Sequence, residues 1–475
     1  MVEKRHDPNE PYPEARGATR ALASFGAQLK YEDIPKEVTE RTKELLVDYI
    51  STVIPAAHED PAQRLIRFAQ SMGGPPQSSI VGTGIRVAPP WAAMVNGSLG
   101  HMMELDDTHR LTMAHPGDSI HASALAIGQH KNVSGKELLT AAVAGYEVAL
   151  RIGESVMPGH YLKGWHSSGT MMTFGAAMVA ARLLGLDAQQ SAWALGTAGA
   201  QACGNFAHLA ERAMTKDFNC GHAAKSGVIA ALLAEQGFTG PTDVVENRRG
   251  FMALYGEGER HPHRLTDGLG ERWKVMEVSQ KAYSGCRYCH PAMDAILSLR
   301  RQHGFTAADV QRVNARVLRT GANLVNDPCP WEGDKALQGT RFSVQFNIAV
   351  ALVKGREGLW DLLDAAHPLV YRDEPEIRQA MSLVDVVPDD ELDKGFPDKW
   401  GTVIAVALRD GRTVEQAVDW PTGEPEVPMT PADRDRKFRT LMGLAKWPEQ
   451  KTEALLRYLQ SIEREADLSG LSPYV

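Results

Sequence analysis

The chain holds its densest group of titratable side chains between His101 and His121, where four carboxylates and four histidines occur. Carboxylates and imidazoles gathered in this way can supply general acid–base catalysis or ligands for a metal ion. Asp106, Asp107 and Thr108 are also good helix-capping residues, so each of them alone has a purely structural explanation. Capping explains the whole cluster less well, and the segment therefore predicts a catalytic or metal-binding site.

Two further segments place polar residues directly before helices rich in small residues. Residues 159–170 hold His166 and Ser168, and Lys216 precedes an Ala-rich helix expected over 222–237. The unpaired N–H groups at a helix N-terminus favour a carboxylate, so these residues could line an anion-binding corner. A serine that merely caps its helix and a lysine that merely faces solvent are the plainer alternatives.

A fourth segment, KAYSGCRYCH at 281–290, combines Lys281, Cys286 and Arg287 with a Cys-x-x-Cys-His spacing. That spacing is used for c-type haem attachment and for half of a zinc site. We expect neither here. The N-terminal segment lacks the apolar run of an export signal, and the other cysteines (Cys203, Cys220 and Cys329) form no second close pair. The segment predicts a turn that binds an anion or supplies a thiol as acid or base, unless the thiol is simply buried.

Composition narrows the class of protein. Hydrophobic residues make up 43% and charged residues 23%, as in globular proteins, and the net charge of −8 includes no basic block. We therefore expect no nucleic-acid partner and no membrane association, since no apolar run approaches the roughly 20 residues that cross a bilayer. Without an export signal, the five cysteines are expected to be reduced thiols, which predicts a cytoplasmic location. No phosphate-binding or dinucleotide motif occurs, so no cofactor is expected.

These segments must be positioned by helices over most of the chain. The pattern is helical over 15–270 and again near the C-terminus, whereas 310–325 alternates like a strand. Residues 402–418 form two alternating runs around Asp410-Gly411, which is typical of a β-hairpin. The expected fold is mainly α. A large all-helical domain (15–270 plus 420–475) is interrupted by a smaller α+β lid domain (271–419).

In this order, the four segments and two later ones resemble the MmgE/PrpD family over about residues 20–445. Members include 2-methylcitrate dehydratase, cis-aconitate decarboxylase and iminodisuccinate epimerase. The family pattern Asp-x-Asp-Asp-Thr falls on Glu104 to Thr108, and its later Arg-Phe-Ser-x-Gln-Phe pattern falls on Arg341 to Phe346. The late segment Pro428 to Arg439 matches as well. The other matched positions are His115, His166, Lys216, Lys281 and Arg287.

The resemblance implies a homodimeric lyase or isomerase that moves a proton next to a carboxylate of a small polycarboxylate, without a metal or cofactor. A base, His115 or His166, would remove the proton, with Asp106 or Asp107 orienting the imidazole. Lys216 would stabilise the developing charge, and Cys286 or His166 would reprotonate. The substrate-binding residues would be Glu104, Thr108, Ser168, Lys281, Arg287 and Arg341.

The sequence departs from the family pattern at several of these positions. Glu104 replaces the usual Asp, Asn219 stands where many members have His, and Cys286 lies where the decarboxylases carry His. Cys286 and the wording around His166 look more like the epimerase branch. Two other classes remain open. One is a metal-dependent hydrolase that uses the His/Asp cluster of 101–121, and the other is a non-catalytic carboxylate-binding helical protein.

Overall fold

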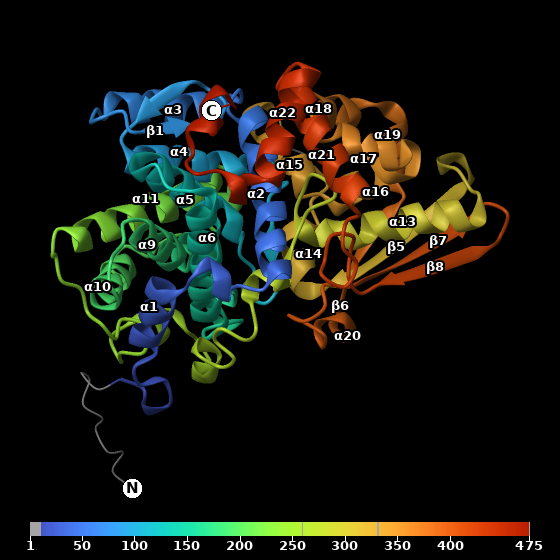
Figure 1. Cartoon of the computed structure of the whole chain (residues 1–475). Coiled ribbons are helices and arrows are strands. Elements are labelled where there is room, and N and C mark those ends of the chain that lie inside the picture. Colours follow the sequence, from blue (N-terminus) through green and yellow to red (C-terminus); the bar gives the residue numbers. More distant parts are fainter. Residues whose placement is uncertain (1–10, 259, 330–331, 475) are drawn as a thin grey trace, which may run out of the picture.

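A computed structural model describes residues 11–258, 260–329 and 332–474, and its fold is mainly α, as predicted (Figure 1). Within residues 11–258, nine helices of eight or more residues dominate the structure. They are α1 (Ala18–Gln28), α2 (Lys36–Ala56), α3 (Asp60–Ser71), α4 (Pro89–Met102), α5 (Pro116–Lys131), α6 (Gly135–Glu154), α9 (Met172–Leu183), α10 (Ala188–Gly199) and α11 (Thr215–Glu235). Three shorter helices lie between or after them: α7 (Gly159–Leu162), α8 (Ser167–Thr170) and α12 (Phe251–Tyr255). Among the described residues, no helix is both long enough and apolar enough to cross a membrane.

Glycines let α4 and α11 approach each other closely. A Cβ atom added at Gly221 would clash with the Met94 carbonyl oxygen, and one at Gly97 would lie 3.1 Å from the Gly221 Cα. This approach fixes the end of α4 beside the start of α11. Because Glu104 follows α4 and Lys216 lies in the first turn of α11, the same packing sets the distance between their side chains.

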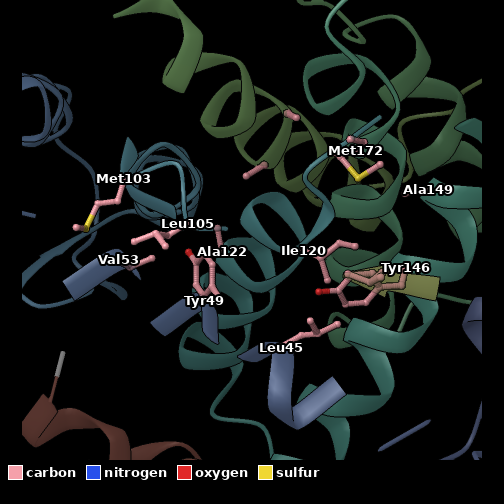
Figure 2. Packing of buried hydrophobic residues seen from close by; sticks show 14 of the residues in the cluster. Leu45, Tyr49, Val53, Met103, Leu105, Ile120, Ala122, Tyr146, Ala149 and Met172 are labelled. Carbon is pink, nitrogen blue, oxygen red and sulfur yellow. The ribbon is translucent and has the colours of Figure 1, made fainter. Parts of the chain in front are cut away.

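Part of the buried core lies along α2. Leu45, Tyr49 and Val53 of that helix point to the same side, with Tyr146 of α6 and Ile120 of α5 close by (Figure 2). Burying such side chains contributes about 1.5–3 kcal/mol each to folding. Two buried hydroxyls also bond within this core: Tyr49 donates to the Asn96 carbonyl oxygen at 3.0 Å, and Tyr146 donates to Asp107 Oδ2 at 3.0 Å.

The second half contains one mixed sheet with the strand order β6-β5-β7-β8. Its strands are β5 (Val310–Leu318), β6 (Val384–Asp389), β7 (Thr402–Leu408) and β8 (Thr413–Val418). β5 and β6 are parallel, and β7 pairs antiparallel with both β5 and β8. The predicted hairpin of 402–418 is confirmed. Helix α13 (His290–His303) packs along β7 and β8, on the right of Figure 1.

Shorter helices complete this half. They are α14 (Arg319–Val325), α15 (Ala336–Arg341), α16 (Val344–Val353), α17 (Gly355–Asp361), α18 (Ala366–Asp373), α19 (Pro375–Ser382) and α20 (Asp390–Asp393). The final helices α21 (Pro431–Leu444) and α22 (Glu449–Gln460) pack against α2 of the first half. The domain boundaries given above stay a prediction.

The structure corrects several local expectations. The alternating run 310–325 is a strand only to Leu318, after which the chain turns into α14. Alternation does not exclude a helix when the segment is short and buried on one side. The helix expected from residue 222 already begins at Thr215. The predicted all-helical part also contains a short antiparallel pair, β1 (Ser78–Ile80) with β2 (Ile85–Val87). It contributes β3 (Thr108–His109) as well, which pairs antiparallel with β4 (Val278–Ser279) of the predicted lid segment.

Candidate active site

The pairing of β3 with β4 brings the loop after α4 beside the segment that begins at Lys281. Each of four successive carbonyls in that loop accepts a hydrogen bond from a distant part of the chain. The donors are Arg341 Nη1 to Met102 (2.7 Å), Ser284 Oγ to Met103 (3.1 Å), Gly285 N to Glu104 (3.2 Å) and Lys437 Nζ to Leu105 (2.8 Å). The loop that carries Glu104 and Asp106 is thus held by residues from the second half and from α21.

Asp106 lies between two imidazoles. Its Oδ2 oxygen is 2.7 Å from the Nδ1 nitrogen of His101 and 2.7 Å from Nδ1 of His115. The backbone oxygen of Asp107 also lies 3.0 Å from His115 Nδ1. Because both neighbours of this nitrogen are acceptors, Nδ1 carries the proton and Nε2 of His115 is left as a proton acceptor.

Glu104 joins two buried lysines. It pairs with Lys216 through Oε1, while its Oε2 oxygen lies 3.1 Å from Lys281 Nζ. Lys281 also lies 3.4 Å from Asp106 Oδ1, and Lys216 contacts Nε2 of His101. Glu104 has φ of 54°, a left-handed conformation that costs a non-glycine residue about 1–3 kcal/mol. The fold keeps this conformation, which turns the carboxylate towards both ammonium groups.

Burial and these ion pairs set the charges of the network. Burial opposes ionisation of Glu104, but Lys216 and Lys281 outweigh it and hold the pKa of Glu104 well below its usual range. Burial likewise opposes the charge on Lys281, but Asp106 and Glu104 raise its pKa. Burial lowers the pKa of His101 to about 4 and that of His166 well below its usual range. At neutral pH the network therefore contains two carboxylates, two ammonium groups and neutral His101 and His166.

A pocket with a cavity volume of about 60 Å³ opens onto this network. Its polar lining is Glu104, Thr108, His115, His166, His208, Lys216, Cys286 and Arg287, and its apolar lining is Met113, Tyr161, Phe206, Leu209, Tyr288, Leu324, Phe342 and Trp400. A volume of this size holds a few water molecules, so a polycarboxylate would need the walls to move apart. Both halves of the chain supply those walls.

Seven of the predicted site residues line the pocket: Glu104, Thr108, His115, His166, Lys216, Cys286 and Arg287. Burial, with the Glu104 charge, raises the pKa of the Cys286 thiol to about 11, so this side chain keeps its proton at neutral pH. Arg287 is already occupied, because its guanidinium donates to Glu424 Oε1 at 2.8 and 3.1 Å. Arg287 is therefore less available to a substrate than the sequence suggested.

The other predicted residues lie behind the pocket or away from it. Asp106 lies behind the pocket and orients the two imidazoles that it contacts. Lys281 is fully buried beside it. Asp107 faces the core, where it accepts from Gly117 N at 2.8 Å and from the Tyr146 hydroxyl at 3.0 Å. Two more predicted residues, Ser168 and Arg341, do not line the pocket. The Ser168 hydroxyl accepts from the His115 backbone N–H at 2.9 Å, whereas Arg341 lines a different cavity.

Sequence reasoning gave no site role to several residues that the structure brings to the pocket. The ring centroid of His208 lies 5.7 Å from that of His166. Tyr288 stacks on Trp400 with 4.4 Å between their ring centroids. No motif surrounds His208. Nothing in an isolated aromatic residue such as Phe342 or Trp400 indicates which side of the fold it faces. His101 belongs to the cluster of 101–121, and that membership was the signal that could have placed it beside Asp106.

The site geometry can be compared with what a metal-dependent hydrolase would need. His101, Asp106 and His115 offer ligand atoms within 4.8 Å of one another. Lys216 already contacts His101, however, and Lys281 lies next to Asp106, so two ammonium groups would repel an added cation. His109 points elsewhere, with Nε2 3.3 Å from Glu277. The arrangement suits a carboxylate better than a metal ion.

Comparisons with known proteins cover nearly the whole chain. The family model described as the MmgE/PrpD N-terminal domain matches residues 20–263, and the model of the MmgE/PrpD C-terminal domain matches residues 283–460. The chain is 27% identical over 472 residues to cis-aconitate decarboxylase of Aspergillus terreus (strain NIH 2624 / FGSC A1156), covering 96% of this chain and 95% of that protein. It is 28% identical to the cis-aconitate decarboxylase-like protein oryM of Aspergillus oryzae (95% and 96% covered). It is 26% identical to cis-aconitate decarboxylase of Homo sapiens (96% and 94% covered).

Proposed function

The chain belongs to the MmgE/PrpD family, and on that premise we propose that it is a lyase of the decarboxylase type that acts on a small polycarboxylate. The observation that carries this proposal is the placement of His115, backed by Asp106, in the same pocket as Lys216. Three relatives bear the name of cis-aconitate decarboxylase or a protein like it, which supports carbon–carbon cleavage over the other family reactions. Epimerisation and dehydration are the alternative outcomes of the same site.

His115 is the proposed base. Its Nδ1 proton is held by Asp106 and the Asp107 carbonyl, so Nε2 presents a lone pair to the pocket. A carboxylate next to the ring also stabilises the imidazolium that forms when the base takes up a proton. Asp106 thereby supports both the orientation and the charge of His115.

Lys216 is the proposed electrophilic group. A substrate carboxylate that reaches this ammonium group competes with Glu104 for it, because the two side chains are paired when no substrate is bound. Charge-assisted hydrogen bonds of this kind are about twice as strong as neutral ones. Lys216 would therefore stabilise the negative charge that spreads onto the carboxylate next to the reacting carbon.

Cys286 or His166 would complete the reaction as the acid. In decarboxylation His115 would take the proton of the departing carboxyl group, the carbon–carbon bond to that group breaks, CO₂ leaves, and the electron pair stays on the substrate as a delocalised carbanion. The Cys286 thiol holds its proton at neutral pH and can pass it to this carbanion, after which the thiolate regains a proton from solvent. A neutral His166 would first need a proton from the substrate or from solvent.

NMR spectroscopy of candidate acids in D₂O tests the proposal. The enzyme is first treated with a metal chelator and then incubated with 2-methylcitrate, citrate, cis-aconitate, iminodisuccinate and tartrate. Loss of CO₂ from one of them, with deuterium at the protonated carbon, is the expected result. Alkene formation from a hydroxy acid would indicate dehydration, and exchange without net change would indicate epimerisation.

Two histidine variants provide the control. His115→Asn should lower turnover by about 10²–10⁴-fold, the usual contribution of a positioned base. His109→Asn changes a buried imidazole of the same loop that does not line the pocket, and it should keep most of the activity. Equal losses in both variants would mean that the effect is structural, and full activity of His115→Asn would remove this residue from the mechanism.

A further inference from the structure

A second cavity, of about 230 Å³, lies beside the active-site pocket. Adjacent residues line the two spaces: Lys216 and Phe342 line the active-site pocket, while Asp217 and Arg341 line the second cavity. The second cavity is almost four times larger, and none of the steps proposed above uses it. Its lining residues come from the starts of α3 and α11 and from α15 and α18.

Arg341 enters this cavity with most of its donors unused. Arg341 is only 5% exposed, and burial lowers the pKa of its guanidinium group. In the part of the chain that the structure describes, its hydrogen bonding is a single bond from Nη1 to the Met102 carbonyl, and Nε has no partner. A desolvated guanidinium without a bonded carboxylate is costly. Glu104, Glu59 and Asp217 offset part of this cost at longer range, and an anionic group in the cavity would supply hydrogen-bond partners for the free donors.

The same cavity holds two acceptors without partners. Asp217 is 2% exposed, and its Oδ1 atom has no hydrogen-bond partner among the described residues; the same is true of Gln338 Oε1. Glu59 and Asp60 add acidic groups to the lining. These acceptors call for a ligand group that donates several hydrogen bonds and carries positive charge.

Apart from Arg212, which pairs with Asp327, the rest of the lining is largely apolar. Met102, Met214, Leu337 and Leu369 contribute hydrophobic surface, and Met214 is 39% exposed. A ligand that satisfies these features has a carboxylate, an ammonium group close to it, and a short apolar chain. We propose that this cavity is a second binding site, which takes an α-amino acid as a zwitterion, its carboxylate on Arg341 and its ammonium on Asp217 and Gln338.

Isothermal titration calorimetry of the full-length protein with L-leucine tests the site. We expect binding with a Kd at or below about 1 mM, and at 10 mM L-leucine a rise in Tm of about 2 °C. Two analogues separate the contributions: 4-methylpentanoate lacks the ammonium group and 3-methylbutylamine lacks the carboxylate. Each should bind at least about tenfold more weakly, because one charge-assisted interaction is lost.

Variants locate the binding. Arg341→Met and Asp217→Asn should each weaken L-leucine binding at least about tenfold. His115→Asn, on the active-site side of the wall, should leave it unchanged, as should Arg434→Gln, which removes an arginine on α21 that pairs with Glu44. Loss of binding in His115→Asn alone would place the ligand in the active-site pocket and overturn the proposal.

Two other results would also overturn it. If L-leucine and both analogues give no heat and no change in Tm, the cavity holds only water. If L-leucine and 4-methylpentanoate bind equally, the site recognises a simple anion and no zwitterion. Should Arg341→Met fail to fold, the analogue series on the unaltered protein and Asp217→Asn still decide between these outcomes.

Discussion

The Nδ1 nitrogen of His115 lies 2.7 Å from the Oδ2 oxygen of Asp106. The same oxygen is equally close to His101, so one carboxylate orients two rings. Asp106 is 2% exposed and its pKa is held well below the usual range, since His115 and Lys281 outweigh the effect of burial. Asp106 therefore stays ionised next to His115 at neutral pH.

Replacing that charge should impair catalysis more than folding. Asp106→Asn keeps the shape of the side chain but removes the charge that stabilises an imidazolium, and its amide can stabilise the wrong tautomer of the ring. We expect kcat to fall by about 10²–10⁴-fold. Steady-state kinetics, with unfolding in urea as a check of the fold, measures both effects. A kcat within twofold of the unaltered enzyme would contradict the role given to Asp106.

Glu104 controls the electrostatics of both lysines. Glu104→Gln leaves Lys216 and Lys281 without their shared carboxylate, and breaking a buried ion pair on one side costs about 3–5 kcal/mol of unfolding free energy. The same change frees positive charge for an added anion. We expect a polycarboxylate such as citrate to raise the Tm of the variant more than that of the unaltered protein. A smaller rise in the variant would contradict this account.

Asp107 should show its effect in stability and its pH dependence. Burial raises the pKa of this carboxyl to about 7 in the folded protein, above the 3.8 of an unperturbed group. The folded state therefore keeps a proton that the unfolded chain releases, so the stability from this group is fully present below pH 4 and declines as the pH rises to about 7. Asp107→Asn removes this dependence. Its deficit in unfolding free energy should be larger at pH 5 than at pH 8, as measured by urea denaturation, while its kcat stays within a few-fold.

Removal of metal ions should leave turnover unchanged. Lys216 and Lys281 lie against His101 and Asp106, two of the three residues of the His101, Asp106 and His115 group at the active site. Activity is therefore expected to be equal before and after dialysis against EDTA, with metal content measured by mass spectrometry. Activity that disappears on chelation and returns with zinc would favour the metal-dependent alternative.

Local patterns were enough to predict the helical fold and the hairpin around Asp410-Gly411, because capping, small-residue helices and turn chemistry are properties of short segments. They also indicated the segments that meet at the pocket. The pairing of those segments could not be predicted from the residues alone. Lys281 belongs to a motif and still has no exposed surface, because a loop 177 positions earlier supplies its carboxylate.

The direction of individual side chains was the least predictable feature. Asp106 and Asp107 are neighbours of the same type, yet one supports the imidazoles and the other holds the start of α5 and Tyr146. Arg341 and Phe342 diverge in the same way, into two different cavities. Which way each residue points depends on φ and ψ angles in irregular loops, such as the left-handed Glu104, and no periodicity reports those angles.

The four carbonyls from Met102 to Leu105 connect the site to the order in which the protein is made. The last of their donors, Lys437, lies in α21 and also pairs with Asp48 of α2 at 2.8 Å. A nascent chain on the ribosome can form the helices of its first half early, but it lacks this donor until α21 has been synthesised. Truncated products of interrupted translation should accordingly carry Glu104 and Asp106 on an untethered loop, and a half-made chain would have no premature activity.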